Sequence, residues 1–382
     1  MKEDRNNMSQ KIKACYIHIP FCEEICSYCD FCKMYYKEQW VNKYLDVLQK
    51  EIEEYYKGET LETIYIGGGT PSCLNPEQLE KLLNIIDIFN KARNCEITIE
   101  ANFENMTEEK LLILKKYGVN RLSFGLQTTN QRLLKILNRY FDKNKVIKLI
   151  KSAKELGFNN INIDLMYAIP QETLEDLKKD LQFIIDLDIE HISTYSLMIE
   201  DHTVLKLKNI ESISEELDYK MYDFICNYLR KKGYDHYEIS NFSKKGLESK
   251  HNMTYWENLE YYGFGLGASF YTNDIRGENT KSFHKYLDKK YILRSEIIDN
   301  KKKMEYEIML NLRLNRGISK RNFYDKFGKD ISVCYNYIEL VRIGLIKENK
   351  DFIYIPENKW YVSNQIIFRF LESGKYGEKF EI

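Results

Sequence analysis

Short runs of β-branched residues alternate with longer amphipathic stretches in the first part of the chain, and this alternation limits the fold more than any other feature. Repeated strand-then-helix units are typical of a mainly parallel sheet, because a parallel strand is reached only through a crossover connection. We count six such units. Their predicted strands are residues 14–19, 63–66, 96–99, 121–124, 160–165 and 191–196.

The segments between these strands carry the signals of helices. In residues 38–56 apolar side chains recur at three- and four-residue spacing, as at Val41, Leu45 and Leu48. Asn75 suits a helix N-cap and Pro76 the first turn that follows. The remaining helical segments are predicted at 107–117, 130–157, 173–187 and 214–232. Six right-handed units predict an α/β fold, a partial (β/α)6 barrel of the TIM type that stays open.

The composition changes twice after the sixth unit, which predicts three regions in the 382 residues. Residues 1–232 would form the partial barrel. Residues 233–300 are rich in Tyr, Gly and Asn without a helical period and read as a connecting region. Residues 301–382 are charged and helix-rich and predict a small C-terminal helical domain.

The charge and hydropathy of the chain exclude several classes of protein. With 57 Lys and Arg against 58 Asp and Glu, no excess of positive charge indicates a nucleic-acid partner. No stretch approaches the roughly 18 apolar residues of a membrane helix, and residues 1–13 lack the apolar core of a secretion signal. We therefore expect a cytoplasmic protein, in which the nine cysteines are thiols or metal ligands rather than disulfides.

Cysteines cluster directly after the first predicted strand, where Cys22, Cys26 and Cys29 form a Cys-x3-Cys-x2-Cys motif. Three thiolates can hold three irons of a [4Fe-4S] cluster and leave the fourth iron open, whereas a closed electron-transfer cluster uses four. The alternative is a zinc site with Cys32 as a fourth ligand. Closed zinc sites more often have two cysteine pairs that are separated by a longer loop.

Polar or glycine residues follow the ends of several predicted strands, and the carboxyl ends of barrel strands are where active sites lie. Gly67, Gly68, Gly69 and Thr70 follow the second strand, and glycines there would let backbone groups approach a ligand. The later strands have Glu100, Gln127, Asp164 and Tyr195 at or near their ends. Each alone could be a cap or a solvated residue, but their recurrence indicates a functional face.

Taken together, these motifs resemble the radical S-adenosylmethionine (SAM) superfamily, and most closely its coproporphyrinogen-oxidase-like branch. The segments 121–127 (RLSFGLQ), 163–170 (IDLMYAIP) and 237–242 (YEISNF) carry the resemblance beyond the cysteines. It implies that SAM binds the open iron of the cluster and that a flavodoxin or ferredoxin supplies the electron. It also implies a set of SAM contacts: Tyr16, Gly68, Gly69, Thr70, Glu100, Gln127, Arg139 and Asp164. Without the resemblance, Arg139 would be an ordinary exposed helix charge.

Two kinds of protein in this branch compete as interpretations: the oxygen-independent coproporphyrinogen III oxidase and the haem chaperone of the HemW type. Phe31 stands where the oxidase has a fourth cysteine, and only 21 residues precede Cys22, where the oxidase has a long segment. Residues 251–256 (HNMTYW) match the His-Asn-x-x-Tyr-Trp motif that is associated with haem in the chaperone. These features favour the chaperone. An electron-transfer or zinc protein is the third interpretation.

The chaperone resemblance implies haem as a ligand, haemoproteins as acceptors and at most transient contact with a membrane. His251 would be the haem residue, since an imidazole can ligate iron and aromatic faces can cover a porphyrin. The alternative is a hydrogen-bonded histidine inside the protein. Departures from the family pattern include Tyr140-Phe141, where a histidine is usual, and Ala168, which replaces a common glycine.

Overall fold

The computed structural model describes residues 12–375 and confirms the α/β architecture. A nine-stranded sheet runs in the order β11-β1-β4-β5-β6-β7-β8-β10-β9. Its six central strands are parallel and match the six predicted units. They are β1 (Ala14–Ile19), β4 (Leu61–Gly68), β5 (Lys91–Asn102), β6 (Arg121–Gln127), β7 (Ile161–Tyr167) and β8 (His191–Ser196).

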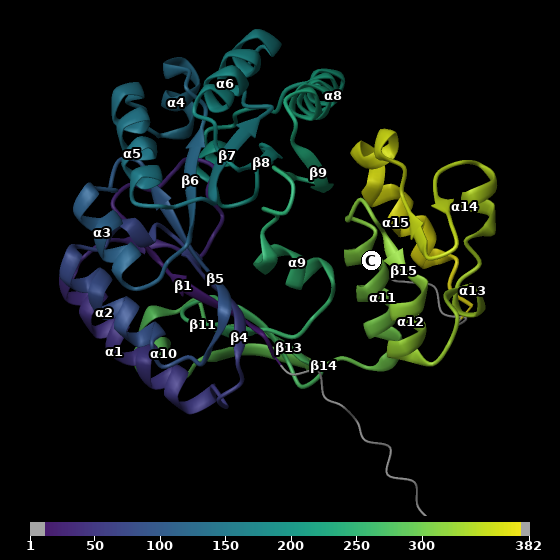
Figure 1. Ribbon diagram of the computed structural model, residues 1–382, viewed down its shortest axis with the longest axis horizontal. Coiled ribbons are helices and arrows are strands. Elements are labelled where there is room, and N and C mark those ends of the chain that lie inside the picture. The colour runs from purple at the N-terminus through teal and green to yellow at the C-terminus, as the bar shows by residue number, and fades with distance from the viewer. Residues whose placement is uncertain (1–11, 376–382) are drawn as a thin grey trace, which may run out of the picture.

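Helices cover the outer face of this curved sheet, as Figure 1 shows. They are α1 (Glu38–Tyr55), α2 (Pro76–Ile86), α3 (Glu108–Lys116), α4 (Gln131–Leu137), α5 (Lys143–Glu155), α6 (Leu174–Asp186) and α8 (Glu215–Lys231). The short α7 (Val204–Leu207) precedes α8 in the chain, and its Leu205 N–H donates to the Ser27 carbonyl at 3.0 Å. The start of α2 is fixed by a capping box in which Asn75 and Gln78 bond each other's backbone N–H groups. The predicted cap is therefore confirmed.

The 233–300 segment extends the sheet at both edges. β11 (Tyr262–Phe264) pairs in parallel with β1, whereas β10 (Asn241–Ser243) pairs antiparallel with β8 and with β9 (Asp235–Glu238). α9 (Lys250–Trp256) lies in the opening between these two edges in Figure 1. The sequence predicts a connecting region here, but the segment completes the wall of the barrel. The domain limits 1–232, 233–300 and 301–382 stay a prediction.

Beyond β11 the chain forms a small antiparallel sheet and then a helical C-terminal region. The small sheet consists of β12 (Ser269–Thr272), β13 (Ile275–Asn279) and β14 (Ile292–Ile297), with α10 (Phe283–Leu287) before the last strand. The C-terminal helices are α11 (Asn300–Asn311), α12 (Lys320–Phe327), α13 (Ile331–Cys334), α14 (Ile338–Arg342) and α15 (Ser363–Glu372). A three-stranded sheet of β15 (Ile318–Ser319), β16 (Lys347–Glu348) and β17 (Phe352–Tyr354) accompanies them.

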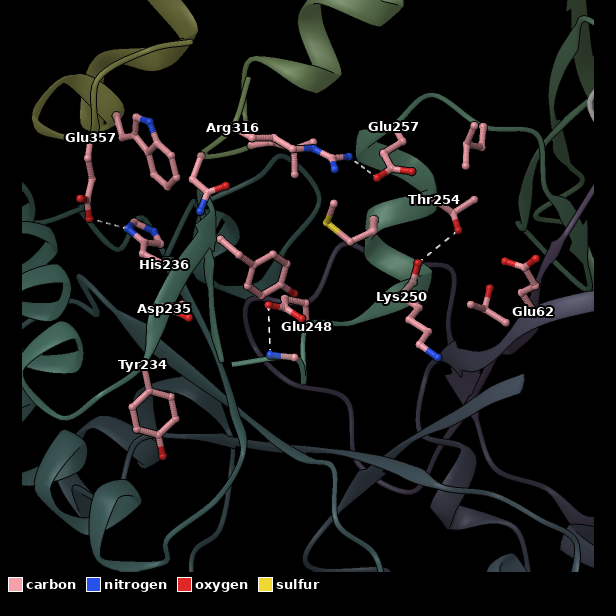
Figure 2. Close-up of a pocket in the computed structure, with 18 of the residues that line it drawn as sticks. Glu62, Tyr234, Asp235, His236, Glu248, Lys250, Thr254, Glu257, Arg316 and Glu357 are labelled. Atoms are coloured by element: carbon pink, nitrogen blue, oxygen red, sulfur yellow. Dashed lines mark hydrogen bonds and ion pairs between the residues drawn. The ribbon is translucent and has the colours of Figure 1, made fainter. Parts of the chain in front are cut away.

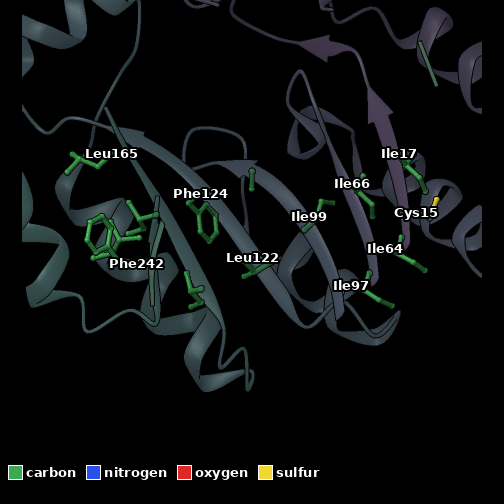
Figure 3. Packing of buried hydrophobic residues seen from close by; sticks show 14 of the residues in the cluster. Cys15, Ile17, Ile64, Ile66, Ile97, Ile99, Leu122, Phe124, Leu165 and Phe242 are labelled. Atoms are coloured by element: carbon green, nitrogen blue, oxygen red, sulfur yellow. The ribbon is translucent and has the colours of Figure 1, made fainter. Parts of the chain in front are cut away.

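Alternation along the strands separates an apolar outer layer from a polar inner face. Figure 3 shows apolar side chains of the parallel strands, such as Ile64, Ile99 and Phe124, in one buried cluster. The residues between them in sequence, such as Tyr65 and Glu100, belong to the opposite, inner face. Within residues 12–375, no helix is both long enough and apolar enough to cross a membrane.

Candidate functional site

The three-cysteine loop lies at the carboxyl end of β1. Cys22 belongs to β2 (Phe21–Cys22), which pairs with β3 (Met34–Tyr35) and so closes the loop that carries Cys26 and Cys29. Cys22 is buried and the other two cysteines are half-buried. Gly69 permits this position, because a Cβ atom there would lie 2.9 Å from the Cys22 Sγ atom and 2.8 Å from the Phe21 carbonyl oxygen. The glycine turn and the cysteine loop are therefore packed against each other.

Two hydrogen-bond donors point at the sulfur atoms. The Thr70 hydroxyl donates to Cys22 Sγ over 3.6 Å, and the Arg139 guanidinium donates to Cys26 Sγ over 3.8 Å. Burial raises the pKa of the Cys22 thiol to about 11, and the Thr70 bond partly offsets this rise. Donors to sulfur stabilise the thiolate, which is the form that binds iron. The donor set therefore fits an iron–sulfur cluster.

Cys32 contacts a different glycine from the one that Cys22 contacts. It packs against Gly267, where a Cβ atom would lie 2.6 Å from the Cys32 Cβ atom. Between Ile12 and Lys375, no three His, Cys, Asp or Glu side chains converge on the position of a single metal ion. Cluster thiolates each bind a different iron, so a [4Fe-4S] cluster does not require such convergence.

Glu100 lies on the inner face at the end of β5 and holds the glycine turn. Its carboxylate accepts hydrogen bonds from the Tyr65 hydroxyl at 2.8 Å and from the Gly68 N–H at 3.0 Å. Gly68 has a φ of +121°, a conformation that favours glycine. Burial raises the pKa of Glu100 to about 7, and the neighbouring Asp164 contributes to the rise. The group can therefore be neutral or charged near neutral pH.

Asp164 and Gln127 extend the inner face along the next two strands. Asp164 accepts a hydrogen bond from the Asn162 amide at 2.7 Å, and burial raises the pKa of its carboxyl. Gln127 is buried, has a φ of +69° and accepts a 2.6 Å bond from the Tyr195 hydroxyl. These predicted residues thus occupy neighbouring strands at the same end of the barrel.

Arg139 also reaches this end, although it follows a surface helix. α4 ends at Leu137, and Asn138 adopts a left-handed conformation with a φ of +53° that redirects the chain. The side chain of Arg139 is only 7% exposed; it donates to the Gly125 carbonyl at 2.8 Å and to Asn102 at 3.1 Å. An interpretation as an exposed helix charge is therefore wrong, and its guanidinium joins the cysteine loop to the inner face.

Comparison with known proteins agrees with this geometry. The radical SAM superfamily pattern matches residues 16–184, and the HemN C-terminal domain pattern matches residues 298–362. The heme chaperone HemW of Lactococcus lactis is 38% identical over 376 residues, which cover 95% of this chain and 98% of that protein. This chain belongs to the HemW family. HemW of Bacillus subtilis is also 38% identical, with 94% of this chain and 99% of that protein covered.

The HemW-family chain also shares its fold with a solved structure, the radical SAM enzyme coproporphyrinogen III oxidase (HemN) from Escherichia coli. The two superpose with a TM-score of 0.83 over 94% of this chain and 90% of that chain, at 21% sequence identity. At this identity the likeness shows the fold alone.

Tyr16 lies on the inner face of β1, beside the cysteine loop. Its hydroxyl is 3.0 Å from His18 Nδ1, and His18 Nε2 is 2.7 Å from the Cys32 carbonyl oxygen. Because that carbonyl can only accept, Nε2 carries the proton and Nδ1 accepts from Tyr16. Burial lowers the pKa of His18 to about 4, so the ring is neutral. Tyr16 thus contacts the loop through His18 rather than through a cluster cysteine.

His251, the first residue of the 251–256 motif, lies on α9 and is 1% exposed. Its Nδ1 is 2.8 Å from the Thr63 hydroxyl and its Nε2 is 2.8 Å from the Tyr255 hydroxyl. The ring stacks on Tyr65 at 5.1 Å, and burial lowers its pKa to about 3. In this arrangement both nitrogens have partners, so direct ligation of haem iron would require one of these bonds to break.

Two cavities flank α9. The larger, about 1040 Å³, lies between the amino ends of β1 and β4, the 233–260 segment and the C-terminal region. Figure 2 shows Lys250, Thr254 and Glu257 of the α9 segment on its wall, opposite His236 and Glu357. The smaller cavity, about 460 Å³, lies between the cysteine loop, the inner face of β1 and α9.

Sequence reasoning missed two side chains that complete the inner face. Tyr65 bonds Glu100 and also stacks against Tyr16, with ring centroids 6.1 Å apart. Asn102 accepts from Arg139 and donates to the Thr70 hydroxyl at 3.3 Å. A signal existed for Asn102, because it follows Glu100 by two positions and therefore shares its face of the strand.

Proposed function

We propose that this chain is a haem chaperone that binds haem and delivers it to acceptor haemoproteins in the cytoplasm. The observation that carries the proposal is the 38% identity, over 95% of the chain, to a relative named as a heme chaperone. The retained His-Asn-x-x-Tyr-Trp motif beside two cavities supports it. Haem would bind next to this motif, in a manner that depends on His251.

Cys22, Cys26 and Cys29 would hold a [4Fe-4S] cluster. The cluster, when bound and reduced by a flavodoxin or ferredoxin, supplies one-electron chemistry to SAM. The chain's own contribution is to stabilise thiolates: Thr70 and Arg139 donate to two of the sulfur atoms. Gly69 leaves the space that the loop needs.

SAM would bind on the inner face, at the end of the barrel where the cysteine loop lies. The backbone of Gly68, Gly69 and Thr70 offers close approach to the amino acid part of SAM. Glu100, Asp164 and Gln127 offer acceptors for its hydroxyl and ammonium groups, and the Arg139 guanidinium suits its carboxylate. Tyr16 would contact SAM from the inner face of β1.

A transfer experiment tests this function. The protein is loaded with haem, separated from free haem, and mixed with the haem-free form of a b-type haemoprotein and, in parallel, with serum albumin as a passive haem sink. We expect haem to pass to the haemoprotein faster than it passes to albumin, because a chaperone delivers haem directly to its acceptor. Equal rates to both acceptors, or no haem retained by the loaded protein, would contradict the proposal.

A further inference from the structure

The residues of the haem motif face two different cavities. Met253 and Thr254 line the larger cavity, whereas Tyr255 lines the smaller one. His251 lines neither and is 1% exposed. A ligand that contacts the motif would therefore lie on one side of α9, either in the larger cavity or in the smaller one.

The charge of the two cavities separates them. Six carboxylates and four Lys or Arg residues line the larger cavity, and three of these cations already pair with Glu62, Glu257 or Glu357. The smaller cavity has Arg276 and Lys281 against the single acid Asp30. Lys281 pairs with Glu278 at 2.8 Å, whereas Arg276 bonds the neutral Asn258, so Arg276 supplies the uncompensated positive charge. Haem carries two propionates, so the smaller cavity suits it better.

The walls of the smaller cavity suit a flat, largely apolar ring. Tyr16, Phe31, Tyr255 and Tyr261 provide aromatic faces. Arg276 is held between the rings of Tyr271 and Tyr306, with its guanidinium carbon 4.1 Å and 4.2 Å from their centroids.

Arg276 also has hydrogen-bond donors left for a carboxylate. One of its terminal nitrogens donates to Asn258 at 2.6 Å, while its Nε is buried without a hydrogen-bond partner. A buried donor without a partner is costly, and a carboxylate would satisfy it.

Several side chains that line this cavity carry an atom that can ligate iron, namely Tyr16, His18, Cys32, Tyr255 and Tyr261. Of these, Tyr255 is the one that belongs to the 251–256 motif and contacts its histidine. Both nitrogens of His18 are engaged, with the Tyr16 hydroxyl and the Cys32 carbonyl. The Tyr255 hydroxyl has a single partner, His251 Nε2 at 2.8 Å, and the opposite nitrogen of His251 meets the Thr63 hydroxyl. Thr63 and His251 thus form a chain of hydrogen bonds that ends on the Tyr255 oxygen.

We propose that haem occupies the smaller cavity and that Tyr255 ligates its ferric iron, with His251 as the positioning residue behind it. This inference rests on the haem binding proposed above. As the iron–oxygen bond forms, the Tyr255 phenol releases its proton to water. His251 then donates its Nε2 proton to the phenolate oxygen while its Nδ1 accepts from Thr63. Tyrosinate is an established ligand of haem iron.

The test is an anaerobic titration of the cluster-loaded protein with ferric haem, followed by absorbance, electron paramagnetic resonance and resonance Raman spectroscopy. For the unchanged protein we expect high-spin iron with a phenolate-to-iron charge-transfer band. Tyr255→Phe keeps the ring and should abolish that band and weaken binding by about tenfold or more. Tyr261→Phe alters the same cavity, its ring 4.6 Å from that of Tyr255, and should leave the band unchanged.

The histidine variant separates a ligand from a positioning residue. His251→Ala should weaken haem binding yet keep the phenolate band, shifted because the phenolate loses its donor. Low-spin imidazole ligation that disappears in this variant would overturn the proposal, as would thiolate ligation that disappears in Cys32→Ser. Retention of the original spectrum by Tyr255→Phe would overturn it as well. A protein that binds no haem would instead reject the proposed function.

Discussion

At the scale of single residues, the cysteine loop carries the most specific chemistry. Thr70 and Arg139 donate to Cys22 and Cys26, whereas Cys32 faces the smaller cavity and packs on Gly267. Substituting Cys22, Cys26 or Cys29 with Ser should remove the cluster absorbance, because each variant lacks a thiolate for one iron. Cys32→Ser is the matched control and should keep the iron content and the spectrum. Loss of the cluster in the control would reject ligation by three cysteines.

Sequence alone predicted the cysteines and the strand-end residues, since both follow from spacing and alternation. It could not predict the position of Arg139 without a family resemblance, because Asn138 signals where the helix ends but not where the next side chain points. It also could not show that His251 is buried with two partners, since Thr63 is 188 residues away in the chain. Ala168, which stands where a glycine is common, adopts a φ of +60° that costs an L-residue roughly 1–2 kcal/mol.

At the scale of elements, the six strands and their helices were predictable, but the wall-completing segment was not. β9, β10 and β11 have three or four residues each, too few for periodicity to be recognised. Their pairing partners are also distant in the chain, as β1 is from β11. Tertiary contacts, rather than local pattern, determine these strands.

Glu51 on α1 shows how that segment is attached. Its buried carboxylate accepts from the Tyr286 hydroxyl at 2.5 Å, the Asn279 amide at 2.6 Å and the Gly265 N–H at 2.9 Å. Burial outweighs these donors and raises the pKa of Glu51 to about 7. One carboxyl thus joins α1 to three points of the 233–300 segment.

This attachment should depend on pH. Because the folded pKa lies above the unfolded value near 4.5, Glu51 binds its proton more tightly when folded. The contribution of the Glu51 proton to the free energy of unfolding is complete below pH 4.5 and is lost as the pH rises through about 7. The loss amounts to at most roughly 3 kcal/mol. Urea unfolding between about pH 5 and about pH 8 should show a smaller decline for Glu51→Gln than for the unchanged protein.

The control is Glu53→Gln, which alters an exposed carboxyl on the same helix and should leave the pH dependence as it is. An identical decline in Glu51→Gln and the unchanged protein would show that the Glu51 proton does not contribute.

At the scale of the whole molecule, the open barrel places a cysteine loop at one end and α9 in its opening. The C-terminal region is attached through the 233–300 segment. The Asn311 amide donates to the Trp256 carbonyl at 3.1 Å, and the backbone of Leu314 forms an antiparallel β-bridge with that of Glu238. Residues 251–256 are therefore held between the barrel and the C-terminal region (Figure 1). Among the residues predicted to contact SAM, Tyr16 is the one that also lines the smaller cavity, so the two proposed sites would share little of the barrel surface.

On the proposed function, this radical SAM scaffold serves haem binding rather than porphyrinogen decarboxylation. The most direct measurement is an anaerobic assay of the cluster-loaded protein with reductant, SAM and coproporphyrinogen III, followed by haem titration of the same sample. We predict no decarboxylated product and stoichiometric haem binding that His251→Ala weakens. Decarboxylated product without haem binding would rule out a haem chaperone and identify the chain as an oxidase.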